Sequence, residues 1–321
     1  MRTTNDSQVD AGTATAADSD EAAAAIALSP QTSIERVIDN PLLEDYGRFL
    51  FPITYRVPEG GDTLADVADL LPWYHYVSVD DTIDVIGDVL SRRQAEQTVF
   101  HSIYSTDEQD ENPDLVDTGL FHFPAQGVSE GERAPFAILC AGGGFAYVGS
   151  IHDSMPHALW LSRHGVHAFT LQYRLGAQVA SEDLARAVSY VVAHADELGV
   201  DASGYSLWGG SAGARVAAYV GSYGPAAFGG DDLPQPTAVV MQYTGHTDTS
   251  GHDPATYGCV GTSDGIANWR AMQSRIETVA AEGVPTELHV FDSLPHGFGL
   301  GRGTVAEGWI QGAFDFWEAQ R

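Results

Sequence analysis

The sequence of 321 residues contains no lysine, and all 15 of its cationic side chains are arginine. The chain also contains 44 aspartate and glutamate residues, so its formal net charge is −29 at pH 7. A field of this sign repels the phosphates of nucleic acids and of anionic lipids. We therefore expect neither nucleic acid nor a membrane surface among the partners of this protein. Polyanionic substrates are disfavoured for the same reason.

Cysteine is also scarce, and no hydrophobic run is long. Cys140 and Cys259 lie in apolar segments and are too few for a disulfide framework, so they predict buried free thiols. No stretch approaches the roughly 18 consecutive apolar residues of a transmembrane helix. The N-terminus lacks the basic and hydrophobic segments of a secretory signal. These absences lead us to expect a cytoplasmic protein.

Apolar residues are present in sufficient number for a folded core, since 44% of the chain is hydrophobic and 10% is aromatic. Residues 1–30 are the exception, because Ala, Thr, Ser and Asp dominate there and predict a disordered acidic tail. Residues 31–97 combine helical periodicity with many aromatic side chains. They predict an N-terminal extension of two or three short helices packed on a larger body. Residues 98–321 form the remaining domain.

In that domain, short apolar runs alternate with longer amphipathic segments. The segment 106–117 is expected to be a loop. Strands are predicted at 98–105, 119–124, 136–141, 167–173, 205–210, 238–244, 257–261 and 287–291. Helices are predicted at 154–164, 182–198, 211–222, 266–281 and 305–319. Strands that alternate with helices indicate an α/β fold, in which a mostly parallel sheet has helices on both faces.

The clearest motif is Gly209-Gly210-Ser211-Ala212-Gly213, which fits the pattern G-x-S-x-G. It lies between a predicted strand and a predicted helix, where a tight turn forces the serine into a strained conformation and exposes its hydroxyl. Glycines at 209 and 213 relieve the crowding of such a turn. The alternative, a glycine-rich turn with an incidental serine, does not explain this context. Ser211 is therefore a candidate nucleophile.

A nucleophilic serine needs a base and an orienting carboxylate, and in this architecture the chain order is serine, acid, histidine. His296, just after the last predicted strand, is the candidate base. Asp264, three residues after the strand 257–261, is the candidate acid, although it could instead cap a helix that begins near Ile266. The other candidate acids lie nearby in the sequence and are Asp248, Asp253 and, less favoured, Asp292.

The negative charge that develops in acyl transfer needs preorganised N–H donors. The N–H of Ala212, directly after the candidate nucleophile, is one expected donor. The run Gly142-Gly143-Gly144 follows the predicted strand 136–141 and is expected to supply others, because glycine lets the backbone approach a tetrahedral carbon closely. A simple sharp turn is the alternative interpretation of this run.

Together these segments resemble the α/β-hydrolase fold, in particular esterases and lipases with an HGGG-type loop. The resemblance covers residues 98–321 and is most specific at 142–145, 209–213, 261–264 and 296–298. It implies a catalytic domain whose second and third loop glycines, Gly143 and Gly144, bind the oxyanion. The segment 139–145 is similar to that of carbohydrate acetyl esterases, while Ala141 replaces the histidine of the hormone-sensitive-lipase-like branch.

We therefore expect a serine hydrolase that cleaves small carboxylic esters with neither a metal nor an organic cofactor. An amidase or aminopeptidase on the same fold, or a non-catalytic binding protein, is the alternative. Phe145, Trp73 and Tyr74 are expected to contact the substrate. Insertions in this family often form a cap, and we expect this role for residues 31–97. Aromatics of the extension, including Phe49 and Phe51, are then expected to roof the site, unless the extension is a buttress or a contact of a possible homodimer.

Overall fold

The computed structural model describes residues 27–129 and 131–321. Most of the predicted tail, residues 1–26, lies outside the described residues. The last residue of that predicted tail is attached to the folded chain, because the carbonyl of Pro30 accepts a hydrogen bond from the N–H of Ala65 at 2.8 Å.

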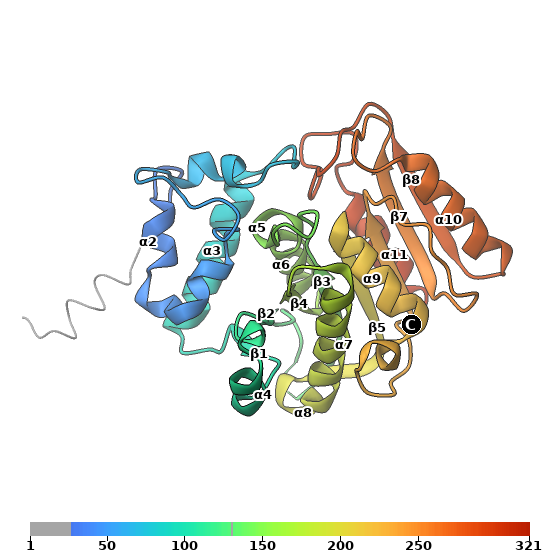
Figure 1. The fold of residues 1–321 in the computed structure, drawn as a ribbon, viewed down its shortest axis with the longest axis horizontal. Coiled ribbons are helices and arrows are strands. Elements are labelled where there is room, and N and C mark those ends of the chain that lie inside the picture. Colours follow the sequence, from blue (N-terminus) through green and yellow to red (C-terminus); the bar gives the residue numbers. More distant parts are fainter. Residues whose placement is uncertain (1–26, 130) are drawn as a thin grey trace, which may run out of the picture.

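The centre of the fold is an eight-stranded sheet with the order β1-β2-β4-β3-β5-β6-β7-β8 (Figure 1). β2 is antiparallel to both β1 and β4, and all the other neighbours are parallel. This confirms the predicted fold class. The strands are β1 (Phe100–Ser102), β2 (Gly119–Phe123), β3 (Ala134–Cys140), β4 (His167–Gln172), β5 (Val200–Gly210), β6 (Ala238–Gln242), β7 (Ala255–Gly261) and β8 (Thr286–Phe291).

Helices cover both faces of this sheet. α7 (Ala177–Ala193) and α9 (Ala212–Tyr223) pack together on one face and lie in front of the sheet in Figure 1. α10 (Trp269–Ala281) joins them through a hydrogen bond from Arg275 to Ser222 of α9. α6 (Met155–Arg163) and α11 (Trp309–Glu318) are in contact with each other through their aromatic rings, with 5.9 Å between the ring centroids of Trp160 and Phe314. The short helices α5 (Ser150–Asp153), α8 (Ala195–Leu198) and η4 (Pro225–Phe228) complete this part.

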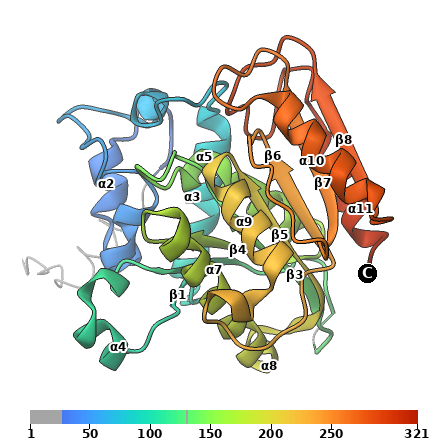
Figure 2. The same ribbon diagram turned by 45° about the vertical axis from the view of Figure 1, so that its right-hand side comes forward.

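The N-terminal extension lies beside the β1 edge, on the opposite side of the molecule from β8 (Figures 1 and 2). It contains α2 (Ile34–Ile38), the 3₁₀ helices η1 (Pro41–Phe49) and η2 (Leu64–Leu70), and α3 (Val79–Gln94). α3 is longer than the short helices expected here. Its apolar stripe includes Val85, Ile86 and Val89, which are fully buried, and Asp84 forms an ion pair with Arg163 of α6 at 2.8 Å. The extension therefore shares one core with the sheet domain.

The expectation of a loop at 106–117 was wrong. The segment forms α4 (Thr106–Glu111) and the 3₁₀ helix η3 (Pro113–Leu115). Ser105 and Glu108 form a capping box, in which the Glu108 carboxylate accepts from the N–H and the hydroxyl of Ser105. That S-x-x-E pattern stabilises a helix start even where no apolar stripe is present.

Several predicted boundaries also shift. α7 begins at Ala177, five residues before the predicted start, and only Phe100–Ser102 of the predicted strand 98–105 pairs in the sheet. α11 begins at Trp309 instead of 305, because Gly308, inside the predicted helix, takes a positive φ of 87° and becomes the N-cap. The prediction for the two cysteines is confirmed, since Cys140 and Cys259 are buried free thiols.

No helix within the described ranges combines the length and the apolar character needed to cross a membrane.

Two buried histidines face each other between neighbouring strands of the sheet. Nε2 of His122 on β2 lies 3.0 Å from Nδ1 of His167 on β4. Burial lowers the pKa of His167 to about 4. Burial, with the neighbouring His167 ring, also lowers the pKa of His122 well below its usual value. The unfolded chain therefore binds more protons than the folded one between pH ~6.5 and pH ~4. The stability that depends on these neutral rings is lost as the pH falls through that window.

We expect the melting temperature of the protein to fall between pH 7 and pH 5, and to fall less in His167→Asn. Asparagine places a neutral polar group near the position of Nδ1 and does not titrate, so one source of acid sensitivity is removed. His252→Asn, at an exposed histidine, is the matched control. An equal fall in wild type and His167→Asn would contradict this explanation of the acid sensitivity.

Candidate active site

Ser211 stands on the sharp turn between β5 and α9. Its φ and ψ of 51° and −114° are unusual for a residue with a side chain. The turn requires glycine at positions 209 and 213. A Cβ at Gly209 would overlap the backbone of Gly213, and a Cβ at Gly213 would overlap the backbone of Cys140. The N–H of Ser211 donates to the carbonyl of Gln242 on β6 at 2.9 Å, which ties the turn to the neighbouring strand. The predicted glycine pattern thus has the expected local geometry.

The structure brings Ser211, His296 and Asp264 together. Nε2 of His296 lies 3.0 Å from Oγ of Ser211, and Nδ1 of His296 lies 2.7 Å from Oδ2 of Asp264. The His296 and Asp264 side chains are 4% and 0% exposed, so water has little access to the link between them. The three residues meet because β5, β7 and β8 run in parallel and end at the same edge of the sheet.

The alternative interpretation, in which Asp264 caps a helix that begins near Ile266, was wrong. α10 begins at Trp269, and its N-cap is Asn268. Oδ1 of Asp264 accepts from the N–H groups of Ile266 and Ala267 at 2.8 and 2.7 Å. These backbone donors hold the carboxylate while its other oxygen faces His296.

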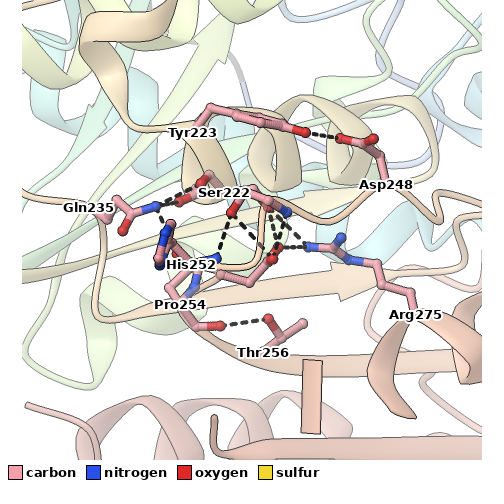
Figure 3. A network of polar contacts seen from close by, with 11 residues as sticks. Ser222, Tyr223, Gln235, Asp248, His252, Pro254, Thr256 and Arg275 are labelled. Atoms are coloured by element: carbon pink, nitrogen blue, oxygen red, sulfur yellow. Dashed lines mark hydrogen bonds and ion pairs between the residues drawn. The ribbon is translucent and has the colours of Figure 1, made fainter. Parts of the chain in front are cut away.

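The other candidate acids lie in different interactions. Asp253 is buried and pairs with Arg275 at 2.8 Å, and Ser222 also donates to it. Figure 3 shows Arg275 directed toward Ser222 in this network, and Tyr223 directed toward Asp248 at 2.8 Å. Asp292 accepts from the hydroxyl of Thr262 at 3.2 Å. None of these contacts involves His296.

The glycine run after β3 approaches Ser211 closely. A Cβ at Gly142 would lie 2.7 Å from Cβ of Ser211. Gly143 and Gly144 have φ values of 128° and 62°, which residues with side chains rarely adopt. The N–H of Gly142 donates to Asp153, whereas within the described chain the N–H groups of Gly143, Gly144 and Ala212 have no acceptor. Those three N–H groups are the donors that the sequence led us to expect.

Asp153, on α5, is a site residue that sequence reasoning missed. Its buried carboxylate accepts from the N–H of Gly142 at 2.6 Å, from the hydroxyl of Tyr74 at 2.9 Å, and from the hydroxyl of Tyr243. Burial raises the pKa of Asp153 to about 6, while these hydrogen bonds act in the opposite direction. No local pattern marks the residue, because its donors come from three distant segments.

The segment Trp73–His75 of the extension lies against the active site. Nδ1 of His75 lies 2.7 Å from the carbonyl oxygen of His296, and the N–H of His75 donates to the carbonyl of Gly297 at 3.0 Å. Trp73 has a φ of 80° and stacks on Tyr147, with 5.5 Å between the ring centroids. Strained backbone conformations of this kind are frequent at functional sites.

Two cavities of about 290 Å³ each flank Ser211. Gly144, Ser211 and Ile266 line both of them. The first is mostly apolar and is lined in addition by Trp73, Tyr74, Gly143 and His296. The second is lined in addition by Phe145, Ala212, Arg215, Tyr243, Thr244, Gly245, His246 and Ala267. All three predicted substrate-contact residues, Trp73, Tyr74 and Phe145, thus line a cavity beside Ser211.

The expectation that Phe49 and Phe51 roof the site was wrong. Both are buried, and neither lines a cavity beside Ser211. Phe49 packs against Phe100 of β1, with 5.4 Å between the ring centroids. Phe49 thus fills the contact between the extension and the edge of the sheet and Phe51 is buried in the core, while Trp73 and Tyr74 reach the site. Composition alone does not separate the two roles.

Within residues 27–129 and 131–321, no three His, Cys, Asp or Glu side chains are grouped so that they could hold a metal ion.

Sequence comparison relates part of this chain to a known family. Residues 124–245 match the model of BD-FAE, an α/β-hydrolase esterase family. The match includes Gly143, Gly144 and Ser211 and ends before Asp264 and His296. No curated protein sequence matches the chain.

Solved structures share the fold at low sequence identity. Esterase 2 of the planctomycete Thermogutta terrifontis, with propionate bound, has a TM-score of 0.58 at 20% identity, over 68% of this chain and 93% of that chain. An acetyl ester-xyloside bifunctional hydrolase of Caldicellulosiruptor lactoaceticus has a TM-score of 0.59 at 20% identity, over 68% and 95%. MGS-M1, an α/β hydrolase from a deep-sea metagenome of the Medee basin, has a TM-score of 0.54 at 20% identity, over 64% and 93%. The protein therefore has the α/β-hydrolase fold, and about a third of its chain has no counterpart in these structures.

The contact of Tyr74 with Asp153 can be tested through the reactivity of Ser211. We expect Tyr74→Phe to slow the labelling of Ser211 by a fluorophosphonate by about three- to tenfold, the size of effect typical of the loss of one hydrogen bond. The loss should be larger at pH 6.5 than at pH 8, because removal of a donor raises the pKa of Asp153 further.

Tyr76→Phe is the matched control, because Tyr76 is an exposed residue of the same segment. If Tyr74→Phe were labelled at the wild-type rate at both pH values, Tyr74 would have no part in positioning the glycine loop.

Proposed function

We propose that this protein is a serine hydrolase that cleaves small carboxylic esters through an acyl-enzyme. The main support is the chain of contacts from Ser211 through His296 to Asp264, with distances of 3.0 and 2.7 Å. This is the arrangement of a nucleophile, a general base and a carboxylate that orients the base. A binding protein that only retained the fold would not need all three groups in contact.

In the first step, Oγ of Ser211 attacks the ester carbonyl and its proton passes to Nε2 of His296. The carboxylate of Asp264 accepts from Nδ1–H of His296 and stabilises the imidazolium that forms. His296 then gives the proton to the alcohol oxygen as the C–O bond breaks. In the second step His296 takes a proton from water, the resulting hydroxide attacks the acyl carbon, and Ser211 recovers its proton.

The oxyanion of each tetrahedral intermediate is bound by the N–H groups of Gly143, Gly144 and Ala212. Preorganised donors of this kind stabilise charge that develops only in the transition state. Ala212 is also the first residue of α9, so the positive end of the helix dipole adds to this stabilisation. Asp153 and Tyr74 act as positioning residues, because they hold the loop that carries the glycines.

The proposed hydrolase activity gives each part of the chain a role. Residues 98–321 are the catalytic domain, and residues 31–97 act as a cap. Support for the cap comes from Trp73 and Tyr74, which line the first cavity, and from His75, which contacts the segment of His296. The cap restricts this cavity to about 290 Å³, a volume suited to a small ester.

The structural relatives support ester chemistry over the cleavage of amides. Esterase 2 of Thermogutta terrifontis has structures with propionate and with butyrate bound, and others in which it is phosphorylated by paraoxon or phosphoramylated by tabun. The relative from Caldicellulosiruptor lactoaceticus is described as an acetyl ester-xyloside hydrolase. We therefore assign short acyl esters, acetyl esters among them, as the substrate class of this chain.

We expect Ser211→Ala to abolish the hydrolysis of 4-nitrophenyl acetate and butyrate, with a loss on the order of 10⁶ in kcat. A fluorophosphonate should label the wild type at Ser211 and should not label the variant. The melting temperature of the variant serves as the control for folding. Turnover by a folded Ser211→Ala within tenfold of wild type would refute the assignment.

We expect Asp264→Asn to lower kcat by about 10⁴, because the amide does not hold the tautomer of His296 that accepts the serine proton. Asp248→Asn is the matched control, since Asp248 accepts from the exposed Tyr223 and makes no described contact with His296. The rates are measured with 4-nitrophenyl butyrate. A near wild-type rate for Asp264→Asn together with an inactive Asp248→Asn would reassign the acid.

A further inference from the structure

Arg215 differs from most arginines of this acidic chain, which form ion pairs with carboxylates. It lies on α9, one turn after the candidate nucleophile, and its N–H donates to the carbonyl of Ser211 at 3.3 Å. Its guanidinium has no carboxylate or hydrogen-bond partner among the residues that the structure describes. It lines the second cavity beside Ser211. Arg215 is an exposed residue, so its guanidinium is solvated and can bind an anionic group that enters this cavity.

His246 lines the same cavity and also has an unsatisfied polar atom. The residue is 3% exposed, and its Nε2 has no hydrogen-bond partner among the described residues. The ring packs edge-on against Tyr219, with 4.7 Å between the centroids. A buried polar nitrogen without a partner is costly unless a ligand or water satisfies it. Arg215 and His246 therefore offer two donors to one space, and no acidic residue lines that space.

The nearby acids are already engaged. Asp253 is paired with the buried Arg275, and Asp248 accepts from Tyr223 (Figure 3). Burial is the main cause that lowers the pKa of His246 to about 4, and the charges of Arg275 and Arg215 lower it further. His246 is therefore neutral at pH 7, and it can donate through Nε2–H while Arg215 supplies the positive charge. The first turn of α9 adds a helix N-terminus to the same cavity.

The chemistry of the proposed reaction assigns one cavity to the alcohol part of the ester and the other to its acyl part. The alcohol oxygen must lie beside His296 to receive its proton, and His296 lines only the first cavity. The acyl group then extends into the second cavity, toward Arg215 and His246.

We propose that the second cavity binds an anionic acyl arm, so that the preferred substrates are half-esters of short dicarboxylic acids whose free carboxylate is held by Arg215 and His246. This inference rests on the proposed ester hydrolysis. A guanidinium binds a carboxylate through two parallel hydrogen bonds, which suits a monoanion of this kind. Arg215 lies four residues after Ser211, ~6 Å along the helix axis, which a chain of four to six carbons can span.

The experiment compares two 4-nitrophenyl esters of similar length, the butyrate and the mono-glutarate, by the ratio of their kcat/KM values. We expect wild type to favour the mono-glutarate. In Arg215→Gln this ratio should fall by about tenfold or more, mainly through the KM of the mono-glutarate, as for a lost charge-assisted hydrogen bond. Arg215→Lys, which keeps the charge without the planar fork, should give an intermediate ratio.

Arg36→Gln is the matched control, because it removes the same charge at an exposed arginine of α2 that has no ion pair in the described chain. Its ratio should equal that of wild type. An unchanged ratio in Arg215→Gln would overturn the inference, and so would an equal fall in Arg36→Gln, which would indicate a long-range effect of net charge. A preference for 4-carboxyphenyl butyrate over phenyl butyrate, lost in Arg215→Gln, would overturn the assignment of the cavity to the acyl arm.

Binding of free glutarate, measured by calorimetry, separates this inference from the proposed hydrolysis. We expect wild type and Arg36→Gln to bind glutarate, and Arg215→Gln to bind it at least about tenfold more weakly. If wild type cleaved no ester but bound glutarate through Arg215, the hydrolase assignment would fall while the anion site would stand. If wild type cleaved butyrate but glutarate bound equally to wild type and Arg215→Gln, the anion site would fall alone.

Discussion

The buried carboxylate of Asp153 joins three segments of the candidate active site that are far apart in the chain. It receives hydrogen bonds from Gly142 of the glycine loop, Tyr74 of the extension and Tyr243 after β6. A buried carboxylate is unfavourable without such donors, so the three segments are held in the arrangement that satisfies it. The glycine loop keeps its position beside Ser211, and the Gly143 and Gly144 N–H groups have no acceptor among the described residues. The geometry that we assign to catalysis depends on this one group.

The N-terminal extension belongs to the same arrangement. It is anchored at one end by Phe49 against the edge strand β1 and at the other by His75 against the segment of His296. Trp73 and Tyr74, which precede the second anchor, line the first cavity together with Ser211. An element that contributes to both the core and a cavity wall couples the stability of the fold to the shape of the site.

Electrostatics act on two length scales in this protein. Over long distances the net charge of −29 repels anions, but salt screens that field within ~8–10 Å. Close to Ser211 the local charges differ from the average, because the carboxylates near His246 are engaged with Arg275 and Tyr223 while Arg215 is unpaired. Net charge therefore excludes polyanionic partners such as nucleic acid more strongly than it excludes a small monoanion bound at one arginine.

The sequence by itself determined the features that depend on neighbouring residues. The turn at Ser211 needs glycine at 209 and 213, the alternation of apolar runs defines the strands, and the chain order leads to His296 and Asp264. Where a local pattern was overlooked, as with the capping box of Ser105 and Glu108, the prediction failed, although the information was present. Only the tertiary structure decided which aromatics reach the site, which acid faces His296, and that Asp153, Arg215 and His246 lie beside Ser211. Those relations depend on the packing of segments separated by tens to hundreds of residues. A periodic pattern shows which face of a segment is buried, but it does not show which other segment packs against that face.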